Sequence, residues 1–179
     1  MKKTILTLIL VICFVSKHLA QEKPLKNGLA IGYQLAQYQN DFGFGLNFTS
    51  PFYFGQNVGF RLKSNVMFLQ HIDASGFTTW TPYANVSLGM IGIGGMVSEN
   101  IRLYGEGGLL VLFPSARFSS QSAQVGDYGL FGFEFFLSKG FNYFIEIGGV
   151  GIGAVADKVP HQPIYSNGLS VGVGFRVVL

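Results

Sequence analysis

Charged side chains are scarce in this sequence. Lysine, arginine, aspartate and glutamate make up 12% of its 179 residues, roughly half of the ~25% found in a typical soluble domain. Glycine and aromatic residues are abundant instead, with 25 glycines and an aromatic fraction of 15%. The length is sufficient for one domain with a full core. A well-hydrated surface is hard to build from this composition, which argues against an ordinary soluble globular domain.

The amino terminus has the features of a secretory signal peptide. Lys2 and Lys3 precede an apolar run, and a short segment after it ends in Ala20. We therefore expect residues 1–20 to be a signal peptide and residues 21–179 to form the mature domain.

Cysteine is almost absent, because Cys13 is the single one and lies within the expected signal peptide. The mature domain then has no disulfide bond. Loss of the signal peptide also lowers the twelve basic residues to nine, which equals the nine acidic residues. The basic balance of the full chain therefore does not indicate a nucleic-acid partner.

Long apolar runs are missing after the signal peptide. The longest mainly apolar stretch, "VSLGMIGIGGMV", covers residues 86–97, whereas a spanning helix needs about 18 or more. The chain instead has stretches in which apolar and small residues alternate. Residues 168–179, "GLSVGVGFRVVL", place apolar side chains at every second position and mostly small residues between them. A period of two predicts a strand with two different faces.

The same alternation recurs along the chain between turn signals. It predicts eight strands, at residues 28–38, 41–49, 58–69, 80–97, 101–113, 128–138, 141–155 and 167–179. Their lengths suit tilted strands that cross a bilayer, which need about 9 to 11 residues. We expect an all-β fold, a closed eight-stranded antiparallel up-and-down transmembrane β-barrel. The apolar phase slips between Met90 and Ile91, which predicts a bulge there or an extension beyond the membrane.

The connections alternate in length. "SPFYFGQN", "SEN" and "SKG" are short, whereas the loops at 70–79, 114–127 and 156–166 are long. The connection around Asn40 and Asp41 is an exception, because it is tight where a long loop would follow the pattern. This layout is typical of a barrel in the outer membrane of a Gram-negative bacterium, with periplasmic turns and extracellular loops.

The two rows of each strand should face different surroundings. We expect the apolar row to face lipid and the small or charged row to face a narrow lumen. Seven charged residues fall on the inward rows near the short turns and are named here the charge belt: Arg61, Lys63, Arg102, Glu106, Glu134, Glu146 and Arg176. Their mixed signs predict a plug of ion pairs, with a loose, water-filled polar lumen as the alternative.

Within the charge belt, Glu134 and Glu146 should lie nearly opposite each other on one hairpin. Two carboxylates so placed repel unless cations lie between them. Arg102 and Arg176 flank that hairpin and are the expected partners.

Aromatic residues cluster near both ends of the expected strands. Phe52, Tyr53, Phe141 and Tyr143 lie at the short-turn end, and Trp80, Tyr83, Phe113 and Tyr128 lie at the long-loop end. This distribution predicts two interfacial girdles.

The alternating rows, the loop asymmetry and the terminal strand with Phe175 resemble the small eight-stranded outer-membrane barrels of the OmpA transmembrane-domain and OmpX type. The resemblance implies a monomer surrounded by outer-membrane lipid, inserted by the outer-membrane assembly machinery through its C-terminal strand. Such proteins usually end in an aromatic residue, whereas this chain ends in Leu179.

One stretch invites an enzymatic interpretation. In "HQPIYSNG", Ser166 and Asn167 are similar to the Ser-Asn pair of outer-membrane lipid A deacylases, and His161 could supply their histidine. Their histidine lies two residues before the serine, whereas the gap here is five and contains Pro163, and no acidic residue follows. Without base geometry or an orienting acid, the triad logic fails. His71 and His161 lie in different expected loops with no cysteine cluster, so we expect no metal site.

We therefore expect a protein without enzymatic activity or cofactor. Its barrel would be a scaffold whose three long loops bind an unknown extracellular ligand or support envelope integrity. The alternatives are a narrow, porin-like pore and a lipid-modifying hydrolase. A secreted soluble barrel of the lipocalin type would turn the apolar rows inward and expose a glycine-rich face to water.

Overall fold

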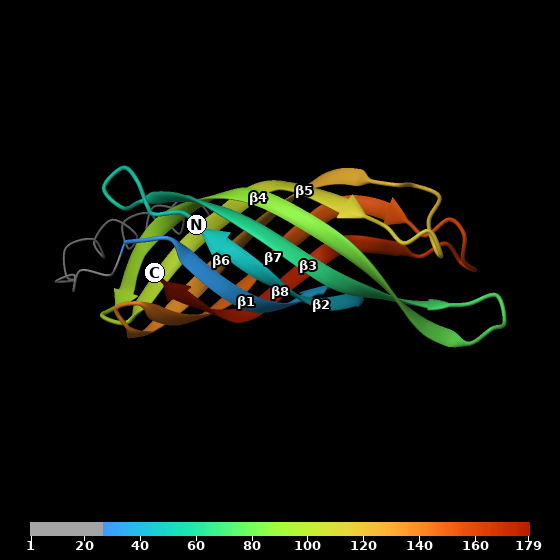
Figure 1. The fold of residues 1–179 in the computed structure, drawn as a ribbon, viewed down its shortest axis with the longest axis horizontal. Helices are drawn as coiled ribbons and strands as arrows, with labels where there is room; N and C mark the ends of the chain where they lie inside the picture. The colour runs from blue at the N-terminus through green and yellow to red at the C-terminus, as the bar shows by residue number, and fades with distance from the viewer. Residues whose placement is uncertain (1–26) are drawn as a thin grey trace, which may run out of the picture.

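In a computed structural model, residues 27–179 are described, and they form a closed ring of eight antiparallel strands (Figure 1). Each strand pairs with the next along the chain, and β8 pairs with β1. The strands are β1 (Ala30–Tyr38), β2 (Asp41–Thr49), β3 (Val58–Ile72), β4 (Thr78–Ser98), β5 (Ile101–Phe113), β6 (Gln124–Ser138), β7 (Phe141–Val155) and β8 (Ile164–Val178). The expected signal peptide at 1–20 and Cys13 lie outside the described residues.

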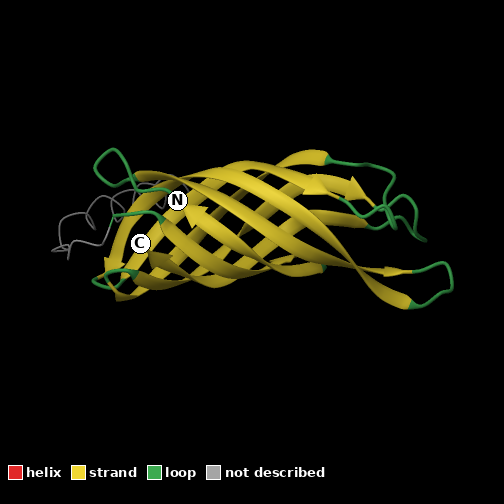
Figure 2. Ribbon diagram, viewed as in Figure 1, coloured by secondary structure: helices red, strands yellow, loops and turns green. Residues whose placement is uncertain are grey.

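The loops are unevenly distributed between the two ends of the barrel. The β1–β2, β3–β4, β5–β6 and β7–β8 connections lie at one end, and the other three lie at the opposite end with both ends of the described chain (Figure 2). The predicted contrast in length is only partly right, because the β2–β3 connection at 50–57 is longer than the β3–β4 loop at 73–77. No helix within residues 27–179 is long and apolar enough to cross a membrane.

The apolar rows face outward, as the alternation predicts. In β2 the phenylalanines at 42, 44 and 48 and Leu46 are 38 to 49% exposed, and the residues between them are buried. In β8 the outward row includes Leu169, Phe175 and Val177, whereas Arg176 points inward and is 1% exposed. Outward apolar rows together with buried charged side chains inside the barrel rule out the lipocalin arrangement.

Closure joins the first strand to the last. The β1–β8 register runs from Ala30 opposite Val178 to Tyr38 opposite Ser170. This pairing satisfies the backbone polar groups that an open sheet edge would expose to hydrocarbon, where no water can replace a missing partner.

Several strands are longer than the sequence predicts at the long-loop end. Ladder pairing continues to Ile72 opposite Thr78 in the β3–β4 hairpin and to Leu112 opposite Gln124 between β5 and β6. The loops therefore shrink to residues 73–77, 114–123 and 156–163. Hairpin pairing does not need to stop where the apolar pattern ends, which explains the difference.

The predicted irregularity in β4 lies further along the strand. Pairing is continuous through Met90 and Ile91, and the register shifts between Ile93 and Gly95 and again between Met96 and Ser98. Ile91 points inward and is 0% exposed. The break in the apolar alternation at Met90 and Ile91 is therefore due to an apolar side chain in the lumen, and the strand has no bulge at these two residues. Gly95 adopts a φ of 129°, which side-chain-bearing residues rarely adopt.

The girdle prediction is right for some aromatic residues and wrong for others. Tyr53, Tyr143, Trp80 and Phe113 are 45 to 51% exposed near the ends of the barrel. Tyr83 and Tyr128 instead point into the lumen and are buried, with exposures of 4% and 8%. Their hydroxyls donate to Asp41 and Glu106, respectively. A buried tyrosine takes this position because its hydroxyl then has an acceptor.

Glycines make room for rings inside the barrel. A β-carbon on Gly132 would lie 2.5 Å from Cζ of Tyr104, and one on Gly89 would lie 2.1 Å from the Tyr128 hydroxyl oxygen. The glycine-rich inward rows therefore hold aromatic side chains from other strands in a narrow lumen.

Candidate functional site

The barrel brings all seven residues of the charge belt together in the half nearer the short turns. Arg61 and Lys63 come from β3, Arg102 and Glu106 from β5, and the others from β6, β7 and β8. Six of the seven are buried, with exposures of 5% or less, and the Arg102 side chain is 13% exposed. Their alternate spacing along the strands places every side chain on the inner face.

Glu146 is the most highly connected carboxylate of the belt. Its Oε1 accepts hydrogen bonds from Arg176 Nη2 at 2.7 Å and Arg61 Nη1 at 3.1 Å. Its Oε2 accepts from Lys63 Nζ at 2.9 Å. The Tyr104 hydroxyl is the fourth donor to this carboxylate and the third to Oε1, at 2.6 Å. A buried carboxylate is stable when its lone pairs are met in this way.

The two other carboxylates divide the cations between them. Glu106 pairs with Arg61 Nη1 at 2.6 Å and with Lys63 Nζ at 2.9 Å. Glu134 accepts from Arg102 Nε and Arg176 Nη1, both at 2.7 Å. Arg61 and Arg176 thus join different carboxylates, and the belt is one continuous network.

The expected partners of Glu134 and Glu146 are only partly the observed ones. Arg176 contacts both carboxylates, whereas Arg102 pairs with Glu134 and stacks between Phe52 and Phe136, 4.8 and 5.0 Å from their ring centres. Arg61 and Lys63, from across the lumen, supply the other cations of Glu146. The two glutamates are offset, because Glu146 lies opposite Gly132 and Glu134 opposite Phe144.

Aromatic rings line the cations of the belt. The guanidinium carbon of Arg176 lies 3.6 Å from the ring centre of Phe144, and that of Arg61 lies 5.1 Å from the Tyr104 ring centre. Lys63 Nζ lies 5.5 Å from the ring centre of Tyr128. Each contact places a cation over a π face, which partly offsets its loss of hydration.

Sequence reasoning missed Tyr104 and Tyr128 as members of this site. Tyr128 donates to Glu106 at 2.7 Å, and Tyr104 donates to Glu146. For Tyr104 a signal was available, because it lies between Arg102 and Glu106 on the same inward row of β5.

A set of buried amides continues the network along the lumen. Arg176 Nε donates to Asn47 Oδ1 at 3.0 Å, and Asn47 Nδ2 donates to Gln34 Oε1 at 3.1 Å. Gln34 then donates to Asn65, which donates to Asn85, at 2.7 and 2.8 Å. Polar groups across the barrel are therefore joined by direct side-chain contacts.

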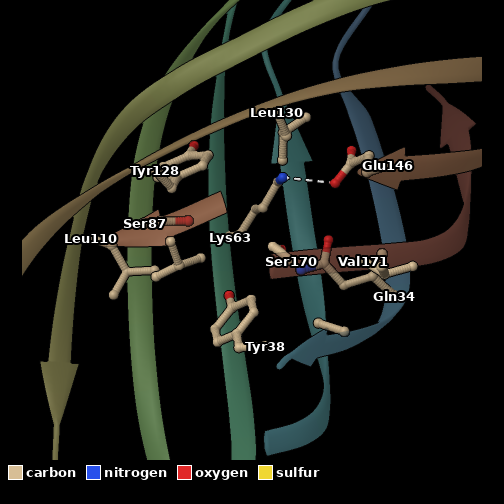
Figure 3. Close-up of a pocket in the computed structure, with 13 residues that line it drawn as sticks. Gln34, Tyr38, Lys63, Ser87, Leu110, Tyr128, Leu130, Glu146, Ser170 and Val171 are labelled. Atoms are coloured by element: carbon tan, nitrogen blue, oxygen red, sulfur yellow. Dashed lines mark hydrogen bonds and ion pairs between the residues drawn. The ribbon is translucent and has the colours of Figure 1, made fainter. Parts of the chain in front are cut away.

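Little open space remains beside this network. Figure 3 shows Lys63 reaching Glu146 between Tyr128 and Gln34, and the cavity there measures about 20 Å³. A cavity needs roughly 10 to 15 Å³ to hold one water molecule, so this space suits about one.

The long-loop end of the lumen is also filled. Phe118, in the β5–β6 loop, has 0% exposure and its ring centre lies 5.0 Å from that of Tyr165 and 6.1 Å from that of Tyr83. Lys158 Nζ donates to the Ala116 carbonyl oxygen at 3.1 Å and ties the β7–β8 loop to the same loop. The β5–β6 loop, which the sequence predicts to be a recognition loop, therefore also packs over the end of the lumen.

The residues of the enzymatic interpretation are not arranged as a triad. His161 is exposed, whereas Ser166 is buried and its backbone N–H donates to Asp41 Oδ2 at 2.7 Å. His71 lies within β3 and bonds Thr81 Oγ1 at 2.9 Å through Nε2. Within residues 27–179, no group of three or more histidine, cysteine, aspartate or glutamate side chains is placed to hold a metal ion.

Comparisons with known proteins identify the fold. No family model matches the chain, and no curated protein matches it significantly. The outer membrane protein OprG from Pseudomonas aeruginosa is similar in structure, with a TM-score of 0.55, 14% identity, and coverage of 89% of this chain and 99% of that one. The Yersinia pestis outer membrane protein Ail, in a phospholipid bilayer nanodisc, has a TM-score of 0.52, 15% identity, and coverage of 86% and 100%. The chain therefore has the fold of small eight-stranded outer-membrane β-barrels.

Proposed function

We propose that this protein is an integral outer-membrane protein of a Gram-negative bacterium whose barrel is a closed scaffold, with neither catalytic activity nor an open channel. The three long loops would lie outside the cell, and residues 1–20 would be removed as a signal peptide. A monomer surrounded by outer-membrane lipid satisfies all the outward apolar rows, and the C-terminal strand would be the segment that the assembly machinery recognises.

The observation that carries this proposal is the filled lumen. Four cations and three carboxylates of the charge belt form a connected, buried network, and Phe118 fills the other end of the lumen. An ion would have to displace ion pairs and aromatic rings to pass. The narrow-pore alternative needs a continuous aqueous path, and the small cavity at Lys63 does not supply one.

The non-enzymatic part of the proposal rests on the chemistry of the site. Each carboxylate of the charge belt is engaged by cations and by tyrosine or arginine donors, so none is placed to act as a general base. The fold likeness to OprG and Ail supports the proposed location.

Membrane fractionation and single-channel recording test the proposal together. The protein should cofractionate with outer-membrane markers after expression in a Gram-negative host. Purified barrels in planar bilayers should show no stable conductance steps in 1 M KCl. Recovery of the full yield in the periplasm or the medium would contradict the membrane location, and regular conductance steps would favour the narrow pore.

A further inference from the structure

The rim of the barrel is lowest at the β1–β2 hairpin. These two strands have 9 residues each, whereas the others have 13 to 21. Pairing of β8 with β1 ends at Ser170 opposite Tyr38, so residues 164–169 of β8 extend above the hairpin. The wall of the barrel therefore ends lower at β1 and β2 than at the strands on either side of them.

A groove of about 330 Å³ lies at this low point of the rim. It is lined by residues 38–41, at the β1–β2 turn, and by Pro163, Ile164, Tyr165 and Asn167. The Gln39 backbone N–H donates to the Leu169 carbonyl oxygen at 2.7 Å and holds the turn against β8. The groove thus has a fixed wall on each side.

Asp41 supplies the buried carboxyl group of this groove. It is 1% exposed, and its Oδ2 accepts from the Tyr83 hydroxyl and the Ser166 N–H, both at 2.7 Å. Its Oδ1 has no hydrogen-bond partner, and no ion pair to Asp41 forms within residues 27–179. The glutamates of the charge belt each have at least two cations, so Asp41 stands apart from them. A buried carboxylate without a cation is costly and calls for a partner.

Other buried polar atoms beside Asp41 also lack partners. Five buried side-chain polar atoms in the described chain have no hydrogen bond, and three of them are Asp41 Oδ1, Tyr165 Oη and Ser166 Oγ. Tyr165 lines the groove with Asp41. Unsatisfied buried groups are rare in folded proteins. Two of these three belong to residues that line the groove, Asp41 and Tyr165, which indicates a site completed by something from outside.

The backbone around the groove is held in unusual conformations. Gln39 has a φ of 48° and Ser166 a φ of 51°, in the left-handed region that glycine favours. Such conformations are unfavourable and persist where the surrounding structure fixes them, often at ligand sites. Strain on both walls is consistent with a preformed site.

We infer that this groove binds a small organic cation through a primary ammonium group that donates to Asp41 Oδ1. An ammonium group carries three donors and a positive charge. Tyr165 and Asn167 also line the groove and carry further acceptor oxygens. A divalent metal ion is a poorer match, because Asp41 is the sole carboxylate lining the groove. The inference goes beyond the closed-scaffold function and does not depend on it, because binding is measured independently of location and conductance.

Nuclear magnetic resonance of the refolded barrel tests the inference. Titration in uncharged, amine-free micelles and phosphate buffer would use ethanolamine hydrochloride as the probe, with ethylene glycol and potassium chloride as controls. We expect saturable shifts of the backbone amides of residues 38–41 and 164–167 with ethanolamine alone. Equal responses to all three solutes, or shifts confined to other parts of the barrel, would overturn the site.

A matched pair of variants isolates the charge. Asp41→Asn keeps the shape and an acceptor for Tyr83 and Ser166 but removes the charge, so ethanolamine binding should weaken by about tenfold or more, as expected when a charged hydrogen-bond partner is lost. Asp73→Asn removes the same charge from the β3–β4 loop, where Asp73 accepts from the Ser75 and Phe77 N–H groups, and binding should not change. Undiminished binding by folded Asp41→Asn would overturn the assignment. If that variant does not fold, the wild-type shift map still decides the question.

Discussion

Arg176 and Glu146 form a direct ion pair between neighbouring strands, with Arg176 Nη2 lying 2.7 Å from Glu146 Oε1 and both residues no more than 4% exposed. Each of the two residues also forms ion pairs with other members of the charge belt. Arg176 also pairs with Glu134, and Glu146 also pairs with Arg61 and Lys63. The effect of a substitution therefore follows from the charge balance of the whole charge belt.

That balance predicts that Glu146→Gln is more harmful than Arg176→Met. The belt has four cations and three carboxylates, so the glutamine variant leaves four cations with two carboxylates and should lose about 3 to 5 kcal/mol of unfolding free energy. The methionine variant leaves three of each sign and should lose about 1 to 3 kcal/mol. Urea unfolding in lipid vesicles measures both values.

The double variant completes this cycle. Because the two side chains touch, its loss should be smaller than the sum of the single losses by about 0.5 to 3 kcal/mol. Additive losses would mean that the pair contributes no coupling, and the lumen would then be better described as loosely hydrated.

Gly132→Ala should disturb the belt without changing any charge. The new β-carbon would lie 2.5 Å from Cζ of Tyr104, so the ring must shift and its hydroxyl must move away from Glu146. Such overpacking typically costs about 1 to 3 kcal/mol, measured by the same urea unfolding. Gly92→Ala is the control, because no atom lies within 4 Å of a β-carbon there. Equal stability of the two variants would contradict the proposed close packing.

The contact between the β5–β6 and β7–β8 loops should depend on pH. The Ser120 hydroxyl and the Ser120 backbone N–H both donate hydrogen bonds to the Asp157 carboxylate, the N–H at 2.8 Å. The hydroxyl bond first, and the N–H bond second, lower the pKa of that carboxyl below its ordinary value of 3.8. A lowered pKa in the folded state means that the contact contributes fully above the ordinary value and is lost as pH falls through the lowered one.

We therefore expect the Ser120 amide resonance to be constant near neutral pH and to move towards a disordered-loop value in strong acid. Asp157→Asn should weaken the contact near neutral pH and remove this titration. A Ser120 resonance that titrates equally in both proteins would show that another group is responsible.

Cysteine labelling tests the orientation of the barrel. Ser122 in the β5–β6 loop and Gln56 in the β2–β3 turn are both exposed, and each would be replaced by cysteine in a chain that carries Cys13→Ser. A membrane-impermeant maleimide added to intact cells should label Ser122→Cys strongly and Gln56→Cys only after the cells are lysed. The reverse pattern would place the long loops in the periplasm.

The sequence by itself determined the class of fold and the direction of each row. A period of two repeated between turn signals specifies strands, and their length and loop asymmetry indicate a closed membrane barrel. It also placed all seven charged residues of the charge belt on the inner face, because alternation depends only on local geometry.

Tertiary structure decided which side chains meet. Arg61 reaches Glu146 from a strand 85 residues away in the sequence, and that contact depends on the stagger of all eight strands around the ring. The inward turn of Tyr83 and Tyr128 depends on carboxylates supplied by other strands. The groove at Asp41 likewise exists because closure brings the start of β2 beside the start of β8. Alternation fixes the facing of a side chain, and only the register of a closed sheet fixes its neighbours.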